Sequence, residues 1–464
     1  MMERNSELME KIVSLCKRRG FVFQGSEIYG GLAGVFDFGP RGVELMNNIK
    51  QSWWKANVYD KENYFGLDSG MFKHPKVWDA SGHTSGFSDP LAECKNCNAR
   101  IRVDKELEKV GVTADEKMSE VEINKLFDSK REEIKCPNCG QKNFSEARAF
   151  NLLVKSNLGD FTSQGTDPVY LPGEACQGIY LNFKNILNTM SPKLPFGVAQ
   201  INKAFRNEIS PRNFLFRTRE FEQADTQLFV KPNENKAAYE AIKEDRWNWY
   251  LSLGIKEENL RWSQHENLVF YCKEAWDIEY NYPTGFDEME GIHDRSDYDL
   301  TQHMKHSGVD LNYTDPETNE KYIPWILETS MGLGRVFLAV LADAYHEEEM
   351  DGSTRTVLKL HKDLAPVRVA VSPLLKNKPQ LVEKAREVFT MLKKEFGNVA
   401  WDDNGNVGKR YRRQDEIGTP HCVVIDFETL GEEDAKLKDT VTIRNRDTGE
   451  QERVHIDTLV EYLK

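Results

Sequence analysis

The chain lacks any long apolar stretch, since no run approaches the ~20 residues needed to span a bilayer. Its opening segment, MMERNSELMEKIVSLCKRRGF, also lacks the apolar core and small-residue cleavage site of a secretion signal. No internal repeat or low-complexity tract is evident. These absences argue against a membrane or repeat protein, and they predict a cytoplasmic chain whose 464 residues form two to four domains with a large core.

The chain has fewer basic than acidic residues: it contains 62 Lys and Arg and 75 Asp and Glu, so its net charge is −13. Such an excess of acid argues against non-specific binding of nucleic acid. One local exception is GKRYRRQ, which groups four basic residues around Tyr411. This cluster is either a solvated turn or a patch that faces RNA or a partner subunit, and the sequence leaves these alternatives open.

Cysteine is scarce, and four of the eight cysteines form two C-x-x-C pairs, Cys94 with Cys97 and Cys136 with Cys139. Each pair can present two thiolates to one metal ion through a tight turn, so two pairs predict a tetrahedral structural Zn²⁺ site. Disulfides or a redox pair are the alternatives, and disulfides suit a chain without a secretion signal poorly. We expect the other four cysteines to be buried thiols: Cys16, Cys176, Cys272 and Cys422.

Composition divides the chain into segments. Residues 104–135, between the two cysteine pairs, are charged, nearly free of aromatics and helix-prone, which is typical of an insertion. Beyond Ala365-Pro366, a strand, a helix at 380–396, a second strand and a hairpin follow one another. This order predicts a separate α/β module of about a hundred residues, an ordinary domain size.

Two arginine-bearing segments carry the strongest functional signal. FRNEISPRNFLFRTREFEQAD, residues 205–225, reads as a strand, a polar loop and a second strand. ETSMGLGRVFLAVL, residues 328–341, places a glycine-rich turn before an arginine and an apolar helix. Arginine offers fixed paired donors and a permanent charge, which suits the binding of phosphate or carboxylate groups.

These segments resemble motifs 2 and 3 of class II aminoacyl-tRNA synthetases. Their residue sequences are similar to those of the dimeric glycyl-tRNA synthetases. The likeness covers nearly the whole chain. It implies an α+β fold, with an antiparallel catalytic sheet flanked by helices over 1–90 and 150–362, and motifs 1, 2 and 3 near 29–54, 201–228 and 326–345. It also implies a Zn-binding insertion at 91–149, a second insertion at 245–320 and a mixed α/β anticodon-binding domain at 363–464.

The resemblance implies ATP as a substrate with Mg²⁺, and it assigns Arg206 and Arg335 as the catalytic pair. Arg206 would contact the α-phosphate, Glu208 the adenine amino group and Arg217 the outer phosphates. The segment DEMEGI resembles the acidic contact of the family with ATP and Mg²⁺. The full implied ATP set is Arg206, Asn207, Glu208, Phe216, Arg217, Thr218, Arg219, Glu220, Phe221, Glu288, Met289, Gly332, Leu333, Gly334 and Arg335.

Glycine has no side chain to hold, so its pocket must bind the ammonium and the carboxylate and exclude bulk at the α-carbon. In the resembling family three acids surround the ammonium, and these match Glu174, Asp225 and Glu328. Ser330 would lie against the α-carbon, and Arg102 would also reach the substrate. The full implied set is Arg102, Glu174, Phe221, Glu222, Gln223, Ala224, Asp225, Glu328, Thr329, Ser330, Met331 and Gly332.

The chain departs from the family pattern at three positions. The family usually reads LRPETAQG where this chain has LPGEACQG, so Pro172 replaces an arginine. Asp225 stands where the family usually has glutamate, and Gly334 stands where many members have aspartate. These changes affect the geometry of the amino-acid pocket and leave the phosphate arginines in place.

The resemblance implies that the chain activates glycine with ATP and transfers it to the terminal adenosine of tRNA(Gly), as a homodimer without membrane attachment. Motif 1 has apolar positions that fit either a dimer interface or a core helix: Val43, Leu45, Met46, Ile49, Trp53 and Trp54. Two other functions remain open. One is a class II synthetase for another small amino acid, such as serine or proline, and the other is a non-catalytic, synthetase-like protein that binds nucleic acid.

Overall fold

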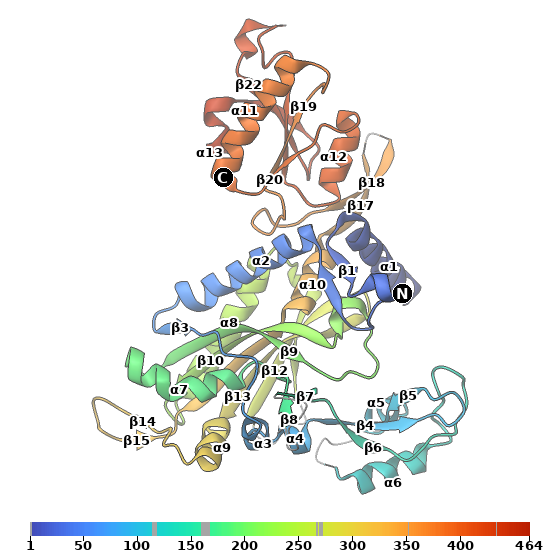
Figure 1. The fold of residues 1–464 in the computed structure, drawn as a ribbon, viewed down its shortest axis with the longest axis vertical. Coiled ribbons are helices and arrows are strands. Elements are labelled where there is room, and N and C mark those ends of the chain that lie inside the picture. Colours follow the sequence, from blue (N-terminus) through green and yellow to red (C-terminus); the bar gives the residue numbers. More distant parts are fainter. Residues whose placement is uncertain are drawn as a thin grey trace.

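The computed structural model describes residues 2–113, 118–158, 168–265, 268, 272–350, 352–432 and 434–464. Figure 1 shows three parts: a large body around one sheet, a small lobe that projects below it, and a C-terminal module that stands above it. The amino terminus lies beside the junction of the body with the C-terminal module.

A seven-stranded sheet with the order β11-β12-β13-β16-β10-β9-β3 forms the centre of the body. All neighbouring strands are antiparallel except β3 and β9, which are parallel. The strands are β3 Tyr64–Gly66, β9 Phe196–Phe205, β10 Glu220–Val230, β11 Leu260–Gln264, β12 Glu274–Tyr282, β13 Gly285–Ser296 and β16 Trp325–Gly332. The sheet has the antiparallel character that the resemblance implies.

Side-chain alternation divides the sheet into two faces. On β10, Ala224 and Leu228 point into one core, which α2 (Pro40–Trp54), α8 (Asn235–Ser252) and α10 (Leu333–Ala344) cover. Phe229 points into a second core on the other face, against α7 (Gln177–Met190) and α9 (Tyr298–Ser307). Asp225 and Phe229 are four residues apart, so Asp225 of motif 2 lies on the second face.

The segment 245–320 is not a separate lobe. Strands β11, β12 and β13 within it extend the catalytic sheet beyond β16, while α9 closes the second face. The insertion at the cysteine pairs, in contrast, forms its own lobe around a three-stranded sheet, with the order β5-β4-β6 and an independent small core. Its elements are β4 Ser88–Glu93, β5 Arg100–Arg102, β6 Arg148–Asn151, α5 Val103–Lys109 and α6 Glu120–Lys130.

The C-terminal module is a five-stranded sheet with the order β20-β19-β21-β22-β23. Strand β19 is parallel to both of its neighbours, and the remaining pairs are antiparallel, so the sheet is mixed. Its core contains only residues from 369 to 463. The elements are β19 Val369–Pro373, α11 Pro379–Phe396, β20 Val399–Trp401, α12 Val407–Asp415, β21 His421–Ile425, β22 Thr440–Asn445, β23 Gln451–His455 and α13 Leu459–Leu463.

Smaller elements complete the fold and join its parts. They are α1 Met2–Arg19, β1 Val22–Gln24, β2 Phe36–Phe38, α3 Lys76–Ala80, α4 His83–Gly86, β7 Lys155–Asn157, β8 Pro168–Tyr170, β14 Tyr313–Thr314, β15 Lys321–Tyr322, β17 Tyr345–Met350 and β18 Ser353–Leu358. The β17–β18 hairpin leads from α10 into the C-terminal module. No helix in the described ranges has the length and apolar character needed to cross a membrane.

A glycine-to-alanine change tests the packing of the motif 1 helix. A Cβ atom at Gly42 in α2 would lie 1.8 Å from the Phe21 carbonyl oxygen, which is backbone and cannot move freely. We expect Gly42→Ala to lower the free energy of unfolding by about 1–3 kcal/mol in chemical denaturation. Gly86→Ala is the control, because nothing lies within 4 Å of its Cβ position. Equal stability of both variants would contradict this packing.

Candidate active site

The two arginines assigned as catalytic lie close together at the end of the central sheet. Arg206 follows β9 and donates from Nε to the Gly173 carbonyl oxygen at 3.2 Å. Its guanidinium lies 5.2 Å from the ring centre of Phe87 and 5.4 Å from that of Phe221. Burial and then the positive charge of Arg335 lower the pKa of Arg206. Two partly buried cations facing each other favour an anion between them.

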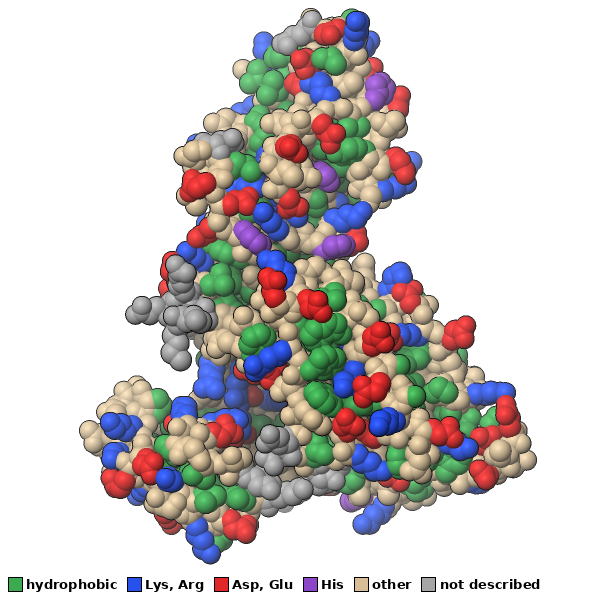
Figure 2. Space-filling view, turned by 180° about the vertical axis from the view of Figure 1, so that it is seen from behind, with side chains coloured by type: hydrophobic (Ala, Val, Ile, Leu, Met, Phe, Trp, Pro, Cys, Tyr) green, Lys and Arg blue, Asp and Glu red, His purple; other side chains and the backbone are tan. Residues whose placement is uncertain are grey.

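Arg335 lies in the first turn of α10, which directly follows strand β16 in motif 3. Its guanidinium covers the Phe216 ring at 4.3 Å and pairs with the Glu288 carboxylate at 3.1 Å. The Arg335 charge lowers the pKa of Glu288, so this carboxylate stays ionised. Three segments far apart in the sequence, the motif 2 loop, β13 and α10, therefore meet at one place. Figure 2 shows a hollow between the small lobe and the body, with Lys and Arg side chains inside it.

The motif 2 loop is held by its own charged residues. Glu208 is buried and accepts a hydrogen bond from Arg217 Nε at 2.7 Å. Arg219 donates to the Glu208 backbone oxygen at 2.9 Å and to the Ala33 backbone oxygen at 3.1 Å. Two residues expected to contact ATP, Glu208 and Arg217, thus bind each other, and adenine or phosphate must compete with this pair.

Glu174 precedes α7 and reaches the same face of the sheet. Its carboxylate accepts hydrogen bonds from Gln177 Nε2 at 2.8 Å and from Cys176 Sγ at 3.1 Å. His83 lies 3.5 Å away and Arg295 4.0 Å away. Burial opposes ionisation, but His83 and Arg295 outweigh it and hold the pKa of Glu174 well below its usual range.

Glu328 on β16 is the second buried acid. It accepts from Gln227 Nε2 at 2.9 Å, from Arg295 Nη1 at 3.0 Å, and contacts His293 Nδ1 at 2.9 Å. Burial again opposes ionisation, yet Arg295 and His293 lower the pKa of Glu328 to about 2. Arg295 therefore neutralises two acids at once, and a third, Asp299, binds it at 2.8 Å.

Asp225 on β10 differs from the other two acids. It is fully buried, and neither carboxylate oxygen has a hydrogen-bond partner. Burial and then the negative charge of Glu328 raise the pKa of Asp225 well above its usual value. Asp225 pairs across the sheet with Ser330. The site thus holds two carboxylates that are already neutralised and one buried carboxyl group that can accept a cation.

Strand alternation separates the other residues of the implied glycine set. Gln223 lies on the face of Asp225, where it accepts from the Ala175 amide at 3.1 Å and donates to the Ser330 hydroxyl. Side chains on the opposite face cannot reach this place, because the sheet lies between them. They are Glu222, which pairs with Lys50, and Ala224, Thr329 and Met331, which lie in or beside the first core.

Two residues of the implied ATP set also point away from any open space. Met289 and Leu333 are fully buried in the first core, so only their backbone atoms can face a ligand. Of the other members, Asn207 is exposed, while Thr218 is buried and donates from its hydroxyl to the Glu220 backbone oxygen at 3.1 Å.

Arg102 is held by two acids of the small lobe. Its guanidinium binds Asp89 at 3.1 Å and Asp104, and Asp89 also lies 3.6 Å from Arg217. The structure therefore joins Arg102 to the motif 2 loop through Asp89. Because Arg102 belongs to β5 of the small lobe, this chain of charges links the lobe to the body.

The structure shows what surrounds Pro172 and Gly334, two of the positions that depart from the family pattern. The Pro172 carbonyl accepts from the Phe205 amide at 2.7 Å, so Pro172 anchors the Glu174 segment to motif 2. In place of an arginine at position 172, Arg295 lies 4.0 Å from the Glu174 carboxylate and the His83 ring 3.5 Å from it. A Cβ at Gly334 would lie 3.2 Å from the Leu215 carbonyl, so this glycine permits close packing of the motif 2 loop.

Sequence reasoning missed several residues that shape the acid pocket. Arg295 supplies its cation, His83 and His293 contact one carboxylate each, and Gln177 and Gln227 orient two of its carboxylates. Each of these residues either lies outside the arginine-bearing segments or belongs to no recognisable sequence motif. A buried acid requires such partners, but the sequence does not say which residues they are.

The four paired cysteines converge in the small lobe as predicted, and all four sulfur atoms lie within 4.8 Å of one another. Cys94 and Cys139 Sγ are 3.6 Å apart, as are Cys97 and Cys136 Sγ. A tetrahedral ion with metal–sulfur bonds of about 2.3 Å places sulfurs about 3.8 Å apart, so the donor set fits a metal. Cys16, Cys176 and Cys422 are buried as expected, whereas Cys272, at the edge of the sheet before β12, is only half-buried.

Asp225→Asn tests the raised pKa. An acid with a raised folded-state pKa costs stability as pH rises from its unfolded value, about 4, through the folded value. We therefore expect the variant to gain stability relative to the wild type as pH increases from 4 to 8, measured by denaturant unfolding. Asp457→Asn is the control, because that side chain is 86% exposed. A difference that does not change with pH would contradict the burial of an uncompensated carboxyl group.

Comparisons with known proteins show the family of the chain. Residues 160–344 match the family described as tRNA synthetase class II core domain (G, H, P, S and T), and residues 368–464 match the anticodon binding domain family. A glycine–tRNA ligase of Clostridium tetani is 50% identical, over 98% of this chain and 97% of that protein. A glycine–tRNA ligase of Geobacillus thermodenitrificans is 49% identical, over 98% and 97%.

A solved structure of Giardia lamblia prolyl-tRNA synthetase in complex with prolyl-adenylate shares the fold. Its TM-score is 0.64 at 13% identity, over 99% of this chain and 77% of that one. With near-complete coverage at about half identity, and with both domain families matched in order, the chain belongs to the glycine–tRNA ligase family of class II aminoacyl-tRNA synthetases.

Proposed function

We propose that the protein joins glycine to tRNA(Gly) in two steps at the site of Arg206, Arg335 and the three acids. The observation that carries the proposal is the grouping of Glu174, Asp225 and Glu328 on one face of the sheet, beside the two arginines. One ammonium ion matches the unpartnered Asp225, and the crowded acids and Ser330 leave little room for a side chain. The ammonium would favour the ionised form of Asp225, because an opposite charge lowers the pKa of a carboxyl group.

In the first step a glycine carboxylate oxygen attacks the α-phosphorus of ATP, and the bond to pyrophosphate breaks. No side chain need act as a strong base. The protein holds the two reactants in line and neutralises charge on the phosphate oxygens, which suits Arg206 between its two aromatic rings. Arg335 would cover the far side of ATP, over Phe216. In the second step the terminal adenosine hydroxyl of tRNA takes the glycyl group and AMP leaves.

Glu288 is our candidate for the carboxylate that binds Mg²⁺ with the phosphates. Mg²⁺ is bound in such sites by one or two carboxylates together with substrate phosphates, and it neutralises phosphate charge. Glu288 is ionised and lies at the Arg335 guanidinium, where an outer phosphate would compete for the same arginine. Asp287, the neighbouring carboxyl group, has a pKa raised by burial and fits this role less well.

We further propose a cytoplasmic homodimer. Several apolar side chains in the segment 28–59 are open to solvent in the single chain, including Ile28 and Tyr29, each 88% exposed. In the motif 1 helix, Leu45, Met46, Ile49 and Trp53 are buried in the core, while Val43 remains 41% exposed. A second copy that covers this apolar surface would remove it from water and so stabilise the assembly.

Arg206→Ala tests the assignment of the first step. Because Arg206 would stabilise charge in the transition state, we expect glycine-dependent ATP–pyrophosphate exchange to fall by about 10²–10³-fold. Arg212→Ala, an exposed arginine in the same loop, is the matched control and should retain activity. Circular dichroism checks that both variants fold. Near-normal exchange by folded Arg206→Ala protein would refute the role of this residue.

Zinc is our candidate for the metal of the four cysteines, because four thiolates in tetrahedral arrangement are its usual structural site. We expect one Zn²⁺ per chain by elemental analysis and its loss in Cys94→Ser protein. The small lobe should then be cleaved faster in limited proteolysis, since its core is small. Cys272→Ser should keep the metal. Full metal content in the Cys94→Ser variant would contradict the site.

A further inference from the structure

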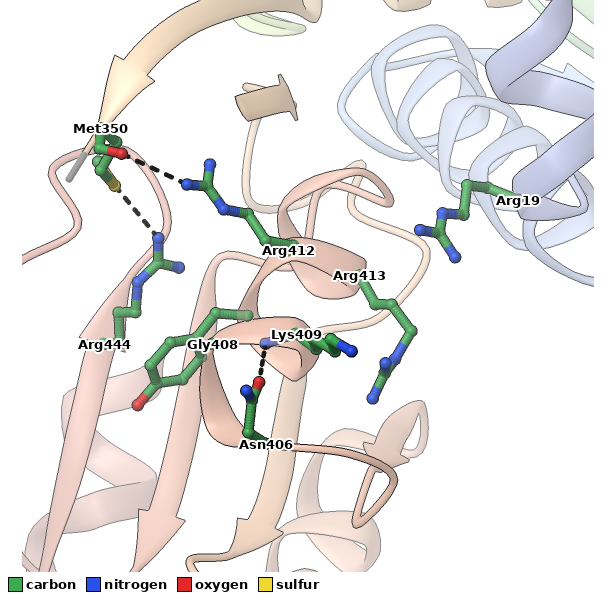
Figure 3. Close-up of a pocket in the computed structure, with 9 residues that line it drawn as sticks. Arg19, Met350, Asn406, Gly408, Lys409, Arg412, Arg413 and Arg444 are labelled. Atoms are coloured by element: carbon green, nitrogen blue, oxygen red, sulfur yellow. Dashed lines mark hydrogen bonds between the residues drawn. The ribbon is translucent and has the colours of Figure 1, made fainter. Parts of the chain in front are cut away.

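A cavity of about 630 Å³ opens where the C-terminal module meets the body. Helix α12 forms one wall, while α1 and the β17–β18 hairpin form the others (Figure 3). The cavity lies far from the three acids, at the opposite end of the body from the small lobe. Its lining residues are Arg19, Met350, Asn406, Gly408, Lys409, Tyr411, Arg412, Arg413 and Arg444.

Five of these nine side chains are cationic, and none is acidic. Three of the cations bind acids that stand behind the wall: Arg413 pairs with Asp402 at 2.8 Å, Arg444 with Asp415 at 2.7 Å, and Arg19 with Glu416. These ion pairs hold the three guanidinium groups in place, and the three arginines still line the cavity. In a chain with net charge −13, such a one-sided lining is exceptional.

Two cations keep free donors. Arg412 donates from Nη2 to the Ser353 hydroxyl at 2.6 Å, but its Nη1 is buried without a hydrogen-bond partner. Lys409 forms no ion pair among the described residues, and Figure 3 shows its side chain on the same side of α12 as Arg413, facing Arg19 of α1. The Nη1 atom is closed off from the cavity, so a ligand there can meet the Lys409 ammonium and the half-buried remainder of the Arg412 guanidinium.

The cavity walls are held rigidly. Asp415, fully buried at the end of α12, binds Arg355 of β18 at 3.0 Å and Arg444 of β22 at 2.7 Å. The hairpin and the module therefore share one carboxylate. Arg18 and Arg19 of α1 reach Glu416, the next residue. A preformed set of donors binds an anion without the cost of ordering them.

The chemistry of the walls favours phosphate over a nucleic-acid base. Among the nine described lining residues Tyr411 alone is aromatic, and the Arg444 guanidinium already covers its ring at 4.7 Å. Guanidinium and ammonium groups bind phosphate oxygens, and such contacts orient a nucleic acid without reading its sequence. We propose that this cavity binds backbone phosphates of the tRNA where it passes from the body to the C-terminal module. The proposal rests on the proposed function, which supplies the RNA.

The test removes the two cations with free donors. In the Lys409→Gln/Arg412→Gln variant we expect the KM for tRNA(Gly) in aminoacylation to rise about 10-fold near physiological salt. The slope of log KM against log salt should fall by about one for each cation removed. Binding of fluorescently labelled tRNA should weaken in parallel, and it is measured without catalysis. Glycine-dependent ATP–pyrophosphate exchange should not change, because it needs no tRNA.

Two further variants sharpen the result. Arg412→Lys keeps a cation in the cavity and should restore most of the tRNA affinity. Lys394→Gln removes one positive charge from α11, on the far side of the module, and should leave the KM for tRNA unchanged. The same loss in the Lys394→Gln protein would indicate a general charge effect and would overturn the proposal.

Other occupants give other outcomes. If inorganic tripolyphosphate raises the Tm of the wild type but not of the double variant, while tRNA binding is equal in both, the cavity binds small polyphosphates and the proposal fails. If the double variant changes the oligomer mass in light scattering and tRNA binding per copy is unchanged, the cavity belongs to an interface between copies. Loss of exchange in the wild type would refute the proposed function, and labelled tRNA would still test the cavity.

Discussion

One buried cation, Arg295, makes the acid pocket possible. It contacts Glu174, Glu328 and Asp299, three carboxyl groups that are largely withdrawn from water and need a compensating partner there. His83 and His293 add a partner to one acid each. Asp225 forms no ion pair with any described residue, and its pKa stays raised because burial and Glu328 outweigh the opposing effects of Ser330 and Arg295. The pocket therefore calls for a positive charge beside this one carboxyl group. A small cation that enters the pocket meets that demand.

The central sheet keeps this charge away from the core. Because side chains alternate along β10 and β16, the acids share one face while Ala224, Leu327 and Met331 pack on the other. The same strands therefore carry both the binding chemistry and the packing that holds it. A shift of one residue in register would exchange the two faces, which explains why motif 2 and motif 3 pair so regularly.

Much of this arrangement could be predicted from the sequence. The arginine-bearing segments, the convergence of the four paired cysteines and the C-terminal α/β module follow from spacing, composition and family resemblance. The neighbours that hold the acids could not be predicted, because Arg295 and His293 come from β13 and approach Glu328 only through strand pairing. For Arg102 the resemblance implies a substrate contact, and the structure adds which residues hold its side chain: Asp89 and Asp104, with Asp89 also beside Arg217 of the motif 2 loop.

The basic cluster of α12 illustrates how tertiary structure gives meaning to an ambiguous pattern. In sequence it is compatible with a solvated turn. In the structure, Arg410 is buried and binds backbone carbonyls, Arg413 and Arg444 bind acids, and only Lys409 and part of Arg412 remain for another molecule. Counting basic residues therefore overstates the charge that is available, and the positions of the free donors matter more.

The crowding of three acids around one small pocket should select an amino acid without a side chain. The most direct measurement is ATP–pyrophosphate exchange by the purified, metal-loaded protein, with glycine, alanine, serine and proline compared in parallel. The account predicts exchange with glycine alone, because a larger substituent would meet Ser330 and the crowded carboxylates. Equal or faster exchange with alanine, serine or proline, or no exchange with any of the four, would contradict it.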